Sequence, residues 1–244
     1  MRFYKFTFML LNTLKKINSL VPLLFPNCCA ICHVRQDKEI CHTCLNNLIQ
    51  HSASKKCILC ACLEKKLLCK YCLHAKHFFD QTIILCYETS YLIPLIRRCD
   101  LHGAIFLLPS IFKAWQVANL RHMTPVDLIL PLPEIPNISQ QRGFWFSLEL
   151  AKKLSRLTKT PYNTDLVYLN SKSDLLLKGT ISDMFNINID LAKSILVNRK
   201  RIAVVMPYMI SESILSDLAK TLKEHGALWV SYWVLTRKLK KDSF

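Results

Sequence analysis

Four Cys-x-x-Cys pairs constrain this chain more than any other feature. The pairs fall within residues 29–72 and consist of Cys29/Cys32, Cys41/Cys44, Cys57/Cys60 and Cys69/Cys72. Two thiolates at this spacing hold one metal ion from a single tight turn, and two such pairs complete the tetrahedral sulfur shell that Zn²⁺ prefers. The eight cysteines therefore predict two zinc sites.

Three other interpretations compete with zinc for this spacing. A disulfide framework needs an oxidising compartment, and no convincing secretory signal precedes the cysteines. A redox dithiol is typically one Cys-x-x-Cys before a helix, whereas this segment is Lys-rich, poor in strands and carries four copies. An iron–sulfur cluster also takes four thiolates, although its spacings are usually more compact or less evenly paired. Zinc is the preferred interpretation.

The spacing also bears on which pairs share a metal. The gap is eight residues inside 29–44 and inside 57–72, against twelve between the two blocks, and this favours sequential pairing. A crossed pairing is also compatible with the spacing, and Cys28 is an alternative to Cys29 as a ligand. Four cysteines outside the pattern are expected to fill core or loop positions, as buried free cysteines commonly do. They are Cys28, Cys62, Cys86 and Cys99.

Length and charge suggest three segments. A chain of 244 residues accommodates one α/β domain and a small appendage. We expect an N-terminal helical segment at 1–25, a double zinc-binding module at 26–78 and an α/β domain at 79–244. Because metal binding supplies folding free energy, the module needs little core of its own. Loss of Cys41 or Cys60 is therefore expected to unfold the module and to leave the α/β domain folded.

The N-terminal segment is apolar from Phe3 to Leu24, but Lys15 and Lys16 interrupt it. No uninterrupted run of about 18 apolar residues is left for a membrane span. Apolar residues recur at helical spacing, which favours a helix packed on the following domain. A cytoplasmic location is expected.

The net charge of +16 is concentrated near the N-terminus, where the first 80 residues hold 12 Lys/Arg against 4 Asp/Glu. A basic metal-binding module suits a polyanion such as single-stranded DNA, because contacts to phosphate release condensed counterions. The alternative is that the charge only keeps the protein soluble. The candidate nucleic-acid-binding residues are Lys55, Lys56, Lys65, Lys66, Lys70 and Lys76.

From residue 80 onward, apolar runs alternate with helical patterns. The predicted strands are 82–87, 126–130, 166–169, 202–206 and 228–235, and the predicted helices are 90–99, 103–120, 144–157 and 211–225. Strands separated by such connections usually form a parallel sheet covered by helices. The fold class is therefore α/β, and the loops after the strands are where ligands are expected to bind.

Several of these segments together resemble the ComF family of competence proteins. The matching segments are the four cysteine pairs, Tyr87-Glu88, Leu95 to Gly103, Asp127 to Pro133, Arg142 to Asn186, and Ile202 to Leu215 followed by Leu222 to Ala227. The resemblance implies a small zinc-ribbon module of the four-cysteine type, followed by a phosphoribosyltransferase-like domain of Rossmann type with a mainly parallel sheet. It also implies an accessory role in DNA uptake, with single-stranded DNA or other competence proteins as partners.

The chain departs from the phosphoribosyltransferase signature loop. Met206 and Pro207 replace the acidic pair that contacts ribose hydroxyls. Glu212 replaces a glycine that lets the backbone approach phosphate, and its carboxylate is expected to repel that anion. Asp100 stands where the family has a lysine that faces pyrophosphate. Removal of these electrostatic elements should cost orders of magnitude in rate. The remnants of the phosphate site are Ser211, Ser213, Arg142 and Gly143, and the two serines are equally well explained as helix caps.

The sequence thus favours a ComF-like accessory protein with a degenerate phosphoribosyltransferase site and no catalytic residues. One alternative is an active phosphoribosyltransferase of nucleotide metabolism, which would use Mg²⁺ and phosphoribosyl pyrophosphate. Another is a protein-interaction scaffold, in which the basic charge has no nucleic-acid partner.

Overall fold

The computed structural model describes most of the chain. The described residues are 28–36, 40–52, 55–88, 90–119, 123–134, 139–140, 143–169, 187–189 and 195–238. The predicted helical segment 1–25 and Arg142 lie outside them. The chain divides into two compact units between Asn47 and Leu48. The expected boundary between the zinc-binding module and the α/β domain, at 78/79, is a statement about which parts fold independently. It stays a prediction.

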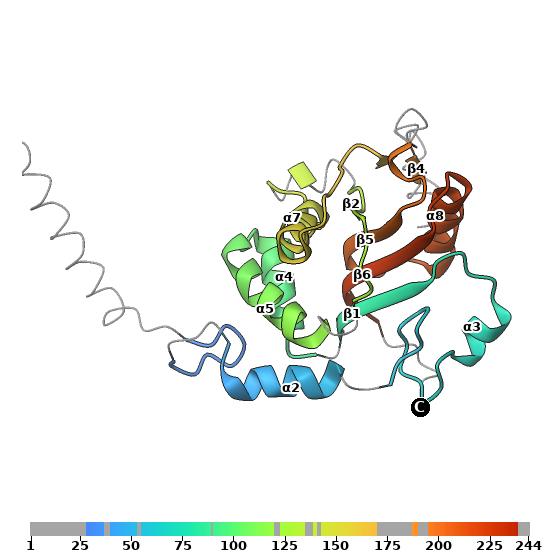
Figure 1. Cartoon of the computed structure of the whole chain (residues 1–244). Coiled ribbons are helices and arrows are strands. Elements are labelled where there is room, and N and C mark those ends of the chain that lie inside the picture. Colours follow the sequence, from blue (N-terminus) through green and yellow to red (C-terminus); the bar gives the residue numbers. More distant parts are fainter. Residues whose placement is uncertain are drawn as a thin grey trace, which may run out of the picture. The chain divides into compact units, whose positions relative to one another are not determined.

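The second unit is built on a four-stranded parallel sheet in the order β1-β6-β5-β2 (Figure 1). Its strands are β1 (Gln81–Tyr87), β2 (Leu128–Pro131), β5 (Arg201–Tyr208) and β6 (Trp229–Arg237). Nearly every strand residue is buried, as expected for a sheet with both faces covered. The prediction of an α/β domain with a parallel sheet is confirmed.

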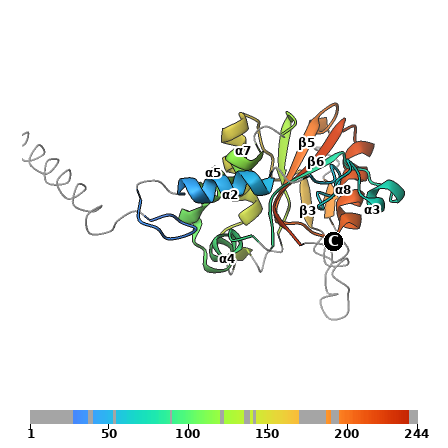
Figure 2. The ribbon, with the colours of Figure 1, turned by 90° about the horizontal axis from the view of Figure 1, so that it is seen from below.

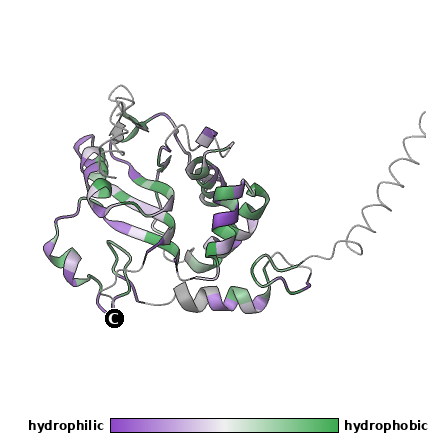
Figure 3. Ribbon diagram, turned by 180° about the vertical axis from the view of Figure 1, so that it is seen from behind, coloured by the Kyte–Doolittle hydropathy of each residue, from purple (hydrophilic) through white to green (hydrophobic). Residues whose placement is uncertain are grey.

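Helices cover both faces of this sheet. They are α4 (Ile93–His102), the short 3₁₀ helix η1 (Ile105–Leu107), α5 (Leu108–Asn119), α7 (Phe146–Thr158) and α8 (Glu212–Glu224). Figures 1 and 2 show α4, α5 and α7 on one side of the sheet and α8 on the other. In Figure 3 the covering helices carry both hydrophobic and hydrophilic residues, as helices with one buried face do. The four predicted helices are confirmed, with shifts at their ends.

One predicted strand has a different place from the one expected. The segment 166–169 does form β3 (Val167–Leu169), but β3 pairs antiparallel with β4 (Ile187–Ile189) in a separate two-stranded sheet. The expectation that this segment joins the parallel sheet was wrong. Its short length and the partner near in sequence explain the difference, because antiparallel strands do not need a long crossover.

The core between the sheet and α8 includes residues from the cysteine-rich segment. Leu215, Leu218 and Leu222 of α8 are buried together with Ala61 and Phe79. The ring of Phe79 meets that of Tyr232 on β6 edge to face, with the centroids 5.2 Å apart. Full burial of a side chain of this size contributes about 1.5–3 kcal/mol. The second cysteine segment therefore shares the core of the α/β domain.

Candidate metal centres and the carboxyl edge of the sheet

The first candidate metal centre consists of Cys29, Cys32, Cys41 and Cys44, whose sulfur atoms all lie within 4.8 Å of one another. The chain turns back after Cys32, because the Cys29 amide donates to Val34 O at 2.8 Å and the His33 amide to Cys29 O at 2.9 Å. His33 has a φ of 59° at this turn. The sequential pairing expected from the spacing is the one that the structure shows. Cys29 rather than Cys28 contributes to the group.

Backbone amides point at the sulfur atoms of this centre. The Cys41 amide lies 3.3 Å from Cys29 Sγ, and the Cys44 amide lies 3.4 Å from Cys41 Sγ. Burial raises the pKa of Cys29, but the amides of Cys32, Cys41 and Ile31 outweigh it and lower the pKa to about 6. Helix α2 (His42–Ser52) begins directly after Cys41, which places Cys44 one turn further on. The amides favour the thiolate form of Cys29, which is the form that binds metal, whereas burial raises the pKa of Cys44.

The second candidate centre repeats this construction. Each of its paired cysteines lies 28 positions after its counterpart in the first centre. The Cys57 amide donates to Cys62 O at 2.9 Å, the Ala61 amide to Cys57 O at 2.8 Å, and Ala61 has a φ of 55°. Cys69 caps helix α3 (Lys70–His74) by accepting the Cys72 amide at 3.4 Å. The two segments therefore share a hairpin followed by a helix.

The second centre differs by one additional thiol. The sulfur atoms of Cys57, Cys60, Cys62 and Cys69 all lie within 4.8 Å of one another. Cys72 is also buried in this cluster, and its amide lies 3.4 Å from Cys69 Sγ. The sequence analysis assigned Cys62 to core or loop filling. The signal that it missed was the position of Cys62 two residues after Cys60.

The sulfur geometry fits zinc. Four thiolates at about 2.3 Å from a tetrahedral Zn²⁺ lie about 3.8 Å from one another. The Sγ–Sγ distance is 3.6 Å between Cys32 and Cys41 and 3.7 Å between Cys60 and Cys69. Soft sulfur donors with no carboxylate among them suit zinc better than magnesium or calcium. The two groups can hold two metal ions.

The second centre is attached to the α/β domain by hydrogen bonds as well as by packing. The Thr82 amide on β1 donates to Ile58 O at 2.9 Å, and the Tyr87 hydroxyl donates to Ala61 O at 2.8 Å. Arg237, at the end of β6, lies within electrostatic reach of both Cys60 and Tyr87. The hairpin of the second metal centre thus contacts β1 near both of its ends, at Thr82 and at Tyr87.

Arg237 also connects this region to the loop after β5. Its guanidinium Nη2 lies 2.7 Å from Glu212 Oε1, and Nη1 lies 3.3 Å from Met209 Sδ. Only 5% of the Arg237 side chain and 11% of the Glu212 side chain are exposed. Glu212 was expected to repel a phosphate as an anion. The structure corrects that reason, because the charge of Glu212 is neutralised by Arg237.

The described residues among the predicted remnants of a phosphate site lie at the same edge of the sheet. Ser211 occupies the N-cap position of α8 without a side-chain cap bond, and its hydroxyl lies 2.7 Å from that of Ser213. The explanation of the serines as side-chain helix caps is therefore not supported. Gly143 follows β2, the neighbour of β5, and has a φ of 77°. Because β2 and β5 are parallel, their following loops share one edge.

Two further residues at this edge face the protein rather than a ligand. Met206 on β5 is fully buried in the core beside α8. Asp100 on α4 is buried, and its Oδ2 accepts a hydrogen bond of 2.8 Å from the Tyr208 hydroxyl. Both residues take part in the domain's own packing and hydrogen bonding.

The predicted DNA-binding lysines are not equivalent. Lys56 is half-buried, its Nζ lies 5.9 Å from the centroid of the Tyr87 ring, and burial lowers its pKa. The others are exposed and belong to the second cysteine segment, where Tyr71 is also 54% exposed. We call this set the basic surface. It comprises Lys55, Lys65, Lys66, Lys70, Lys76 and Tyr71.

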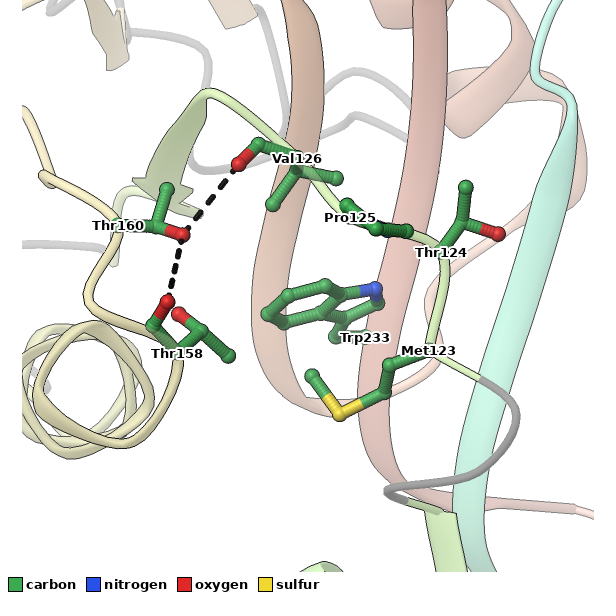
Figure 4. Close-up of a pocket in the computed structure, with 7 residues that line it drawn as sticks. All are labelled: Met123, Thr124, Pro125, Val126, Thr158, Thr160 and Trp233. Atoms are coloured by element: carbon green, nitrogen blue, oxygen red, sulfur yellow. Dashed lines mark hydrogen bonds between the residues drawn. The ribbon is translucent and has the colours of Figure 1, made fainter.

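A cavity of about 250 Å³ lies beside the residues that precede β2, and no cysteine lines it (Figure 4). Trp233 forms one wall, and its indole Nε1 has no hydrogen-bond partner within the described part of the chain. The Thr160 hydroxyl donates to the carbonyls of Val126 and Thr158 at 3.3 and 3.4 Å. The cavity contains no charged side chain and none of the predicted site residues.

No family model matches this chain, and no curated protein matches it either. Among the described residues, no helix has the length and apolarity to cross a membrane. The functional assignment therefore rests on the cysteine centres, the basic surface and the edge of the sheet.

Proposed function

We propose that this chain is a ComF-like accessory protein of DNA uptake that binds single-stranded DNA through the basic surface. The observation that carries the proposal is the concentration of exposed lysines on a segment that the second cysteine cluster holds in place. In this assignment the α/β domain is of phosphoribosyltransferase type and acts as a scaffold in the cytoplasm. The two cysteine clusters bind Zn²⁺.

The basic surface supplies both elements that single-stranded nucleic acids need. Lysine ammonium groups neutralise phosphates without reading sequence, and an exposed aromatic ring offers a face for a base to stack on. Tyr71 lies next to Lys70 on α3, whose first turn follows the metal ligand Cys69. Metal binding at the second centre would therefore fix the ring and the neighbouring charge together.

A salt series of filter-binding measurements with single-stranded DNA tests this proposal. Replacing Lys65 and Lys66 by Gln should reduce the slope of log affinity against log salt by roughly one unit for each lysine that neutralises a phosphate. Tyr71→Ala should weaken binding by about 1–3 kcal/mol at every salt concentration. Lys56→Gln is the matched control and should leave the slope unchanged, since the Lys56 ammonium lies over the Tyr87 ring. Affinity that does not change with salt would favour the scaffold alternative.

The alternative of an active phosphoribosyltransferase has a separate test. We expect no turnover of phosphoribosyl pyrophosphate, because Met206 is buried in the core and Glu212 occupies the position of the phosphate-binding glycine. Calorimetric titration with this compound and Mg²⁺ should show no binding. Micromolar, magnesium-dependent binding would instead support the enzyme.

A further inference from the structure

The second cysteine cluster holds five sulfur atoms where a tetrahedral ion needs four. Cys60 and Cys69 lie together in this cluster, with their sulfur atoms 3.7 Å apart. The sulfur of Cys62 lies within 4.8 Å of both of them and of Cys57. Cys72 is buried in the same cluster, and its amide lies 3.4 Å from Cys69 Sγ. All five cysteines are at most 7% exposed. Two different fourth sulfurs therefore lie beside the same three partners.

The first centre is a natural comparison, because it has the same backbone and one thiol fewer. Cys62 occupies the position of Val34, and in both hairpins this residue supplies the carbonyl that accepts the amide of the first cysteine. Val34 is 58% exposed and carries no ligand atom. The additional thiol is thus a property of the second centre alone.

We propose that Cys62 is a metal ligand of the second centre and exchanges with Cys72 in the shell of one thiophilic divalent cation. In the exchange, the bond between Cys72 sulfur and the metal breaks and Cys72 takes a proton, while Cys62 loses a proton and bonds to the metal. The charge of the cluster stays the same. The inference rests on the zinc binding that the proposed function assigns to these cysteines.

Zinc content of full-length variants, purified under reducing conditions, tests the exchange. The wild type should hold two zinc ions per chain. Cys72→Ser and Cys62→Ser should each still hold two, and the double variant should hold one. Cys44→Ser is the control, and it should hold one because the first centre has no fifth thiol. A Cys72→Ser variant that also holds one would overturn the role of Cys62.

A measurement on the wild type covers the case in which Cys72→Ser does not fold. Limited alkylation of the zinc-loaded protein should modify Cys62 in some molecules and Cys72 in others, with two zinc ions retained in both populations. Modification of Cys62 alone would show that Cys72 is a permanent ligand and would overturn the exchange. Fewer than two zinc ions in the untreated wild type would contradict the metal assignment itself, whatever the role of Cys62.

Discussion

The two cysteine segments have the same hairpin, and in both the amide of the last paired cysteine bonds to the sulfur three residues earlier, yet they stand in different surroundings. In the first, Cys32 is exposed and the cluster belongs to the unit that ends at Asn47. In the second, every cluster sulfur is buried, and Ala61 of the hairpin is part of the α/β core. The same motif thus orders a small unit by itself in one case and completes a larger domain in the other.

The largest expected difference follows loss of a metal ligand. Cys60→Ser should lower the stability of the α/β domain by several kcal/mol, because metal binding at this cluster is folding free energy for a segment that shares the core. For a domain of this size the melting temperature should fall by about 10 °C. Cys32→Ser should leave the main thermal transition unchanged. Calorimetry on both variants measures the contrast.

A chelator should reproduce this contrast in the wild type. If both variants or neither shift the main transition, the two segments do not differ in their coupling to the domain. If neither variant shifts it, the sequence-based expectation that loss of Cys60 spares the α/β domain holds.

A second feature of the surroundings of the second segment is the buried ion pair between Arg237 and Glu212. Glu212→Gln should destabilise the domain by about 3 kcal/mol, because it leaves the charge of Arg237 buried without its carboxylate. Urea denaturation measures this loss. The double variant Glu212→Gln/Arg237→Met should recover more than half of it, since it removes the unpaired charge. A loss below about 0.5 kcal/mol would mean that the pair behaves like an exposed one.

The sequence predicted the elements of the α/β domain well, because they rest on local patterns. Buried strands read as continuous apolar runs, and α8 carries apolar residues at helical spacing ended by Gly226. The sequential pairing of the cysteines followed from equal gaps. The order of the strands was not predictable in this way, since β1 and β6 pair across most of the chain.

The features that the sequence did not predict depend on contacts between distant residues. Glu212 looked like a free anion because its partner Arg237 lies 25 positions later, on another element. Ala61 belongs to no sequence motif, although it fills the core beside Phe79. Cys62 does not belong to a Cys-x-x-Cys pair and was therefore not predicted as a metal ligand. In each case the neighbour comes from the fold rather than from the motif.

A smaller effect is expected at the hydrogen bond that ties the second hairpin to β1. Tyr87→Phe removes the donor to Ala61 O and should cost about 1 kcal/mol, while the ring keeps its packing. The loss should appear both in urea denaturation and as faster hydrogen exchange of the hairpin amides 57–62. The hairpin amides 29–34 should not change. Equal changes in both hairpins would contradict a local effect.

The smallest expected effects concern the residue that turns each hairpin. His33 and Ala61 both have a positive φ, which costs an L-residue roughly 1–2 kcal/mol, and part of this is regained on substitution by glycine. At exposed position 33, His33→Gly should therefore tighten zinc binding about twofold to fivefold. Ala61→Gly gains the same backbone freedom but loses a methyl group from the core, worth about 0.8 kcal/mol, so zinc affinity should hardly change. Competition with a chelator on full-length protein measures the zinc affinity of both centres. The Cys32→Ser variant lacks a ligand of the first centre and so identifies which step of the titration belongs to that centre. If Ala61→Gly increased zinc affinity at the second centre as much as His33→Gly does at the first, the methyl group of Ala61 would contribute nothing to the core. The second hairpin would then be no more part of the α/β domain than the first.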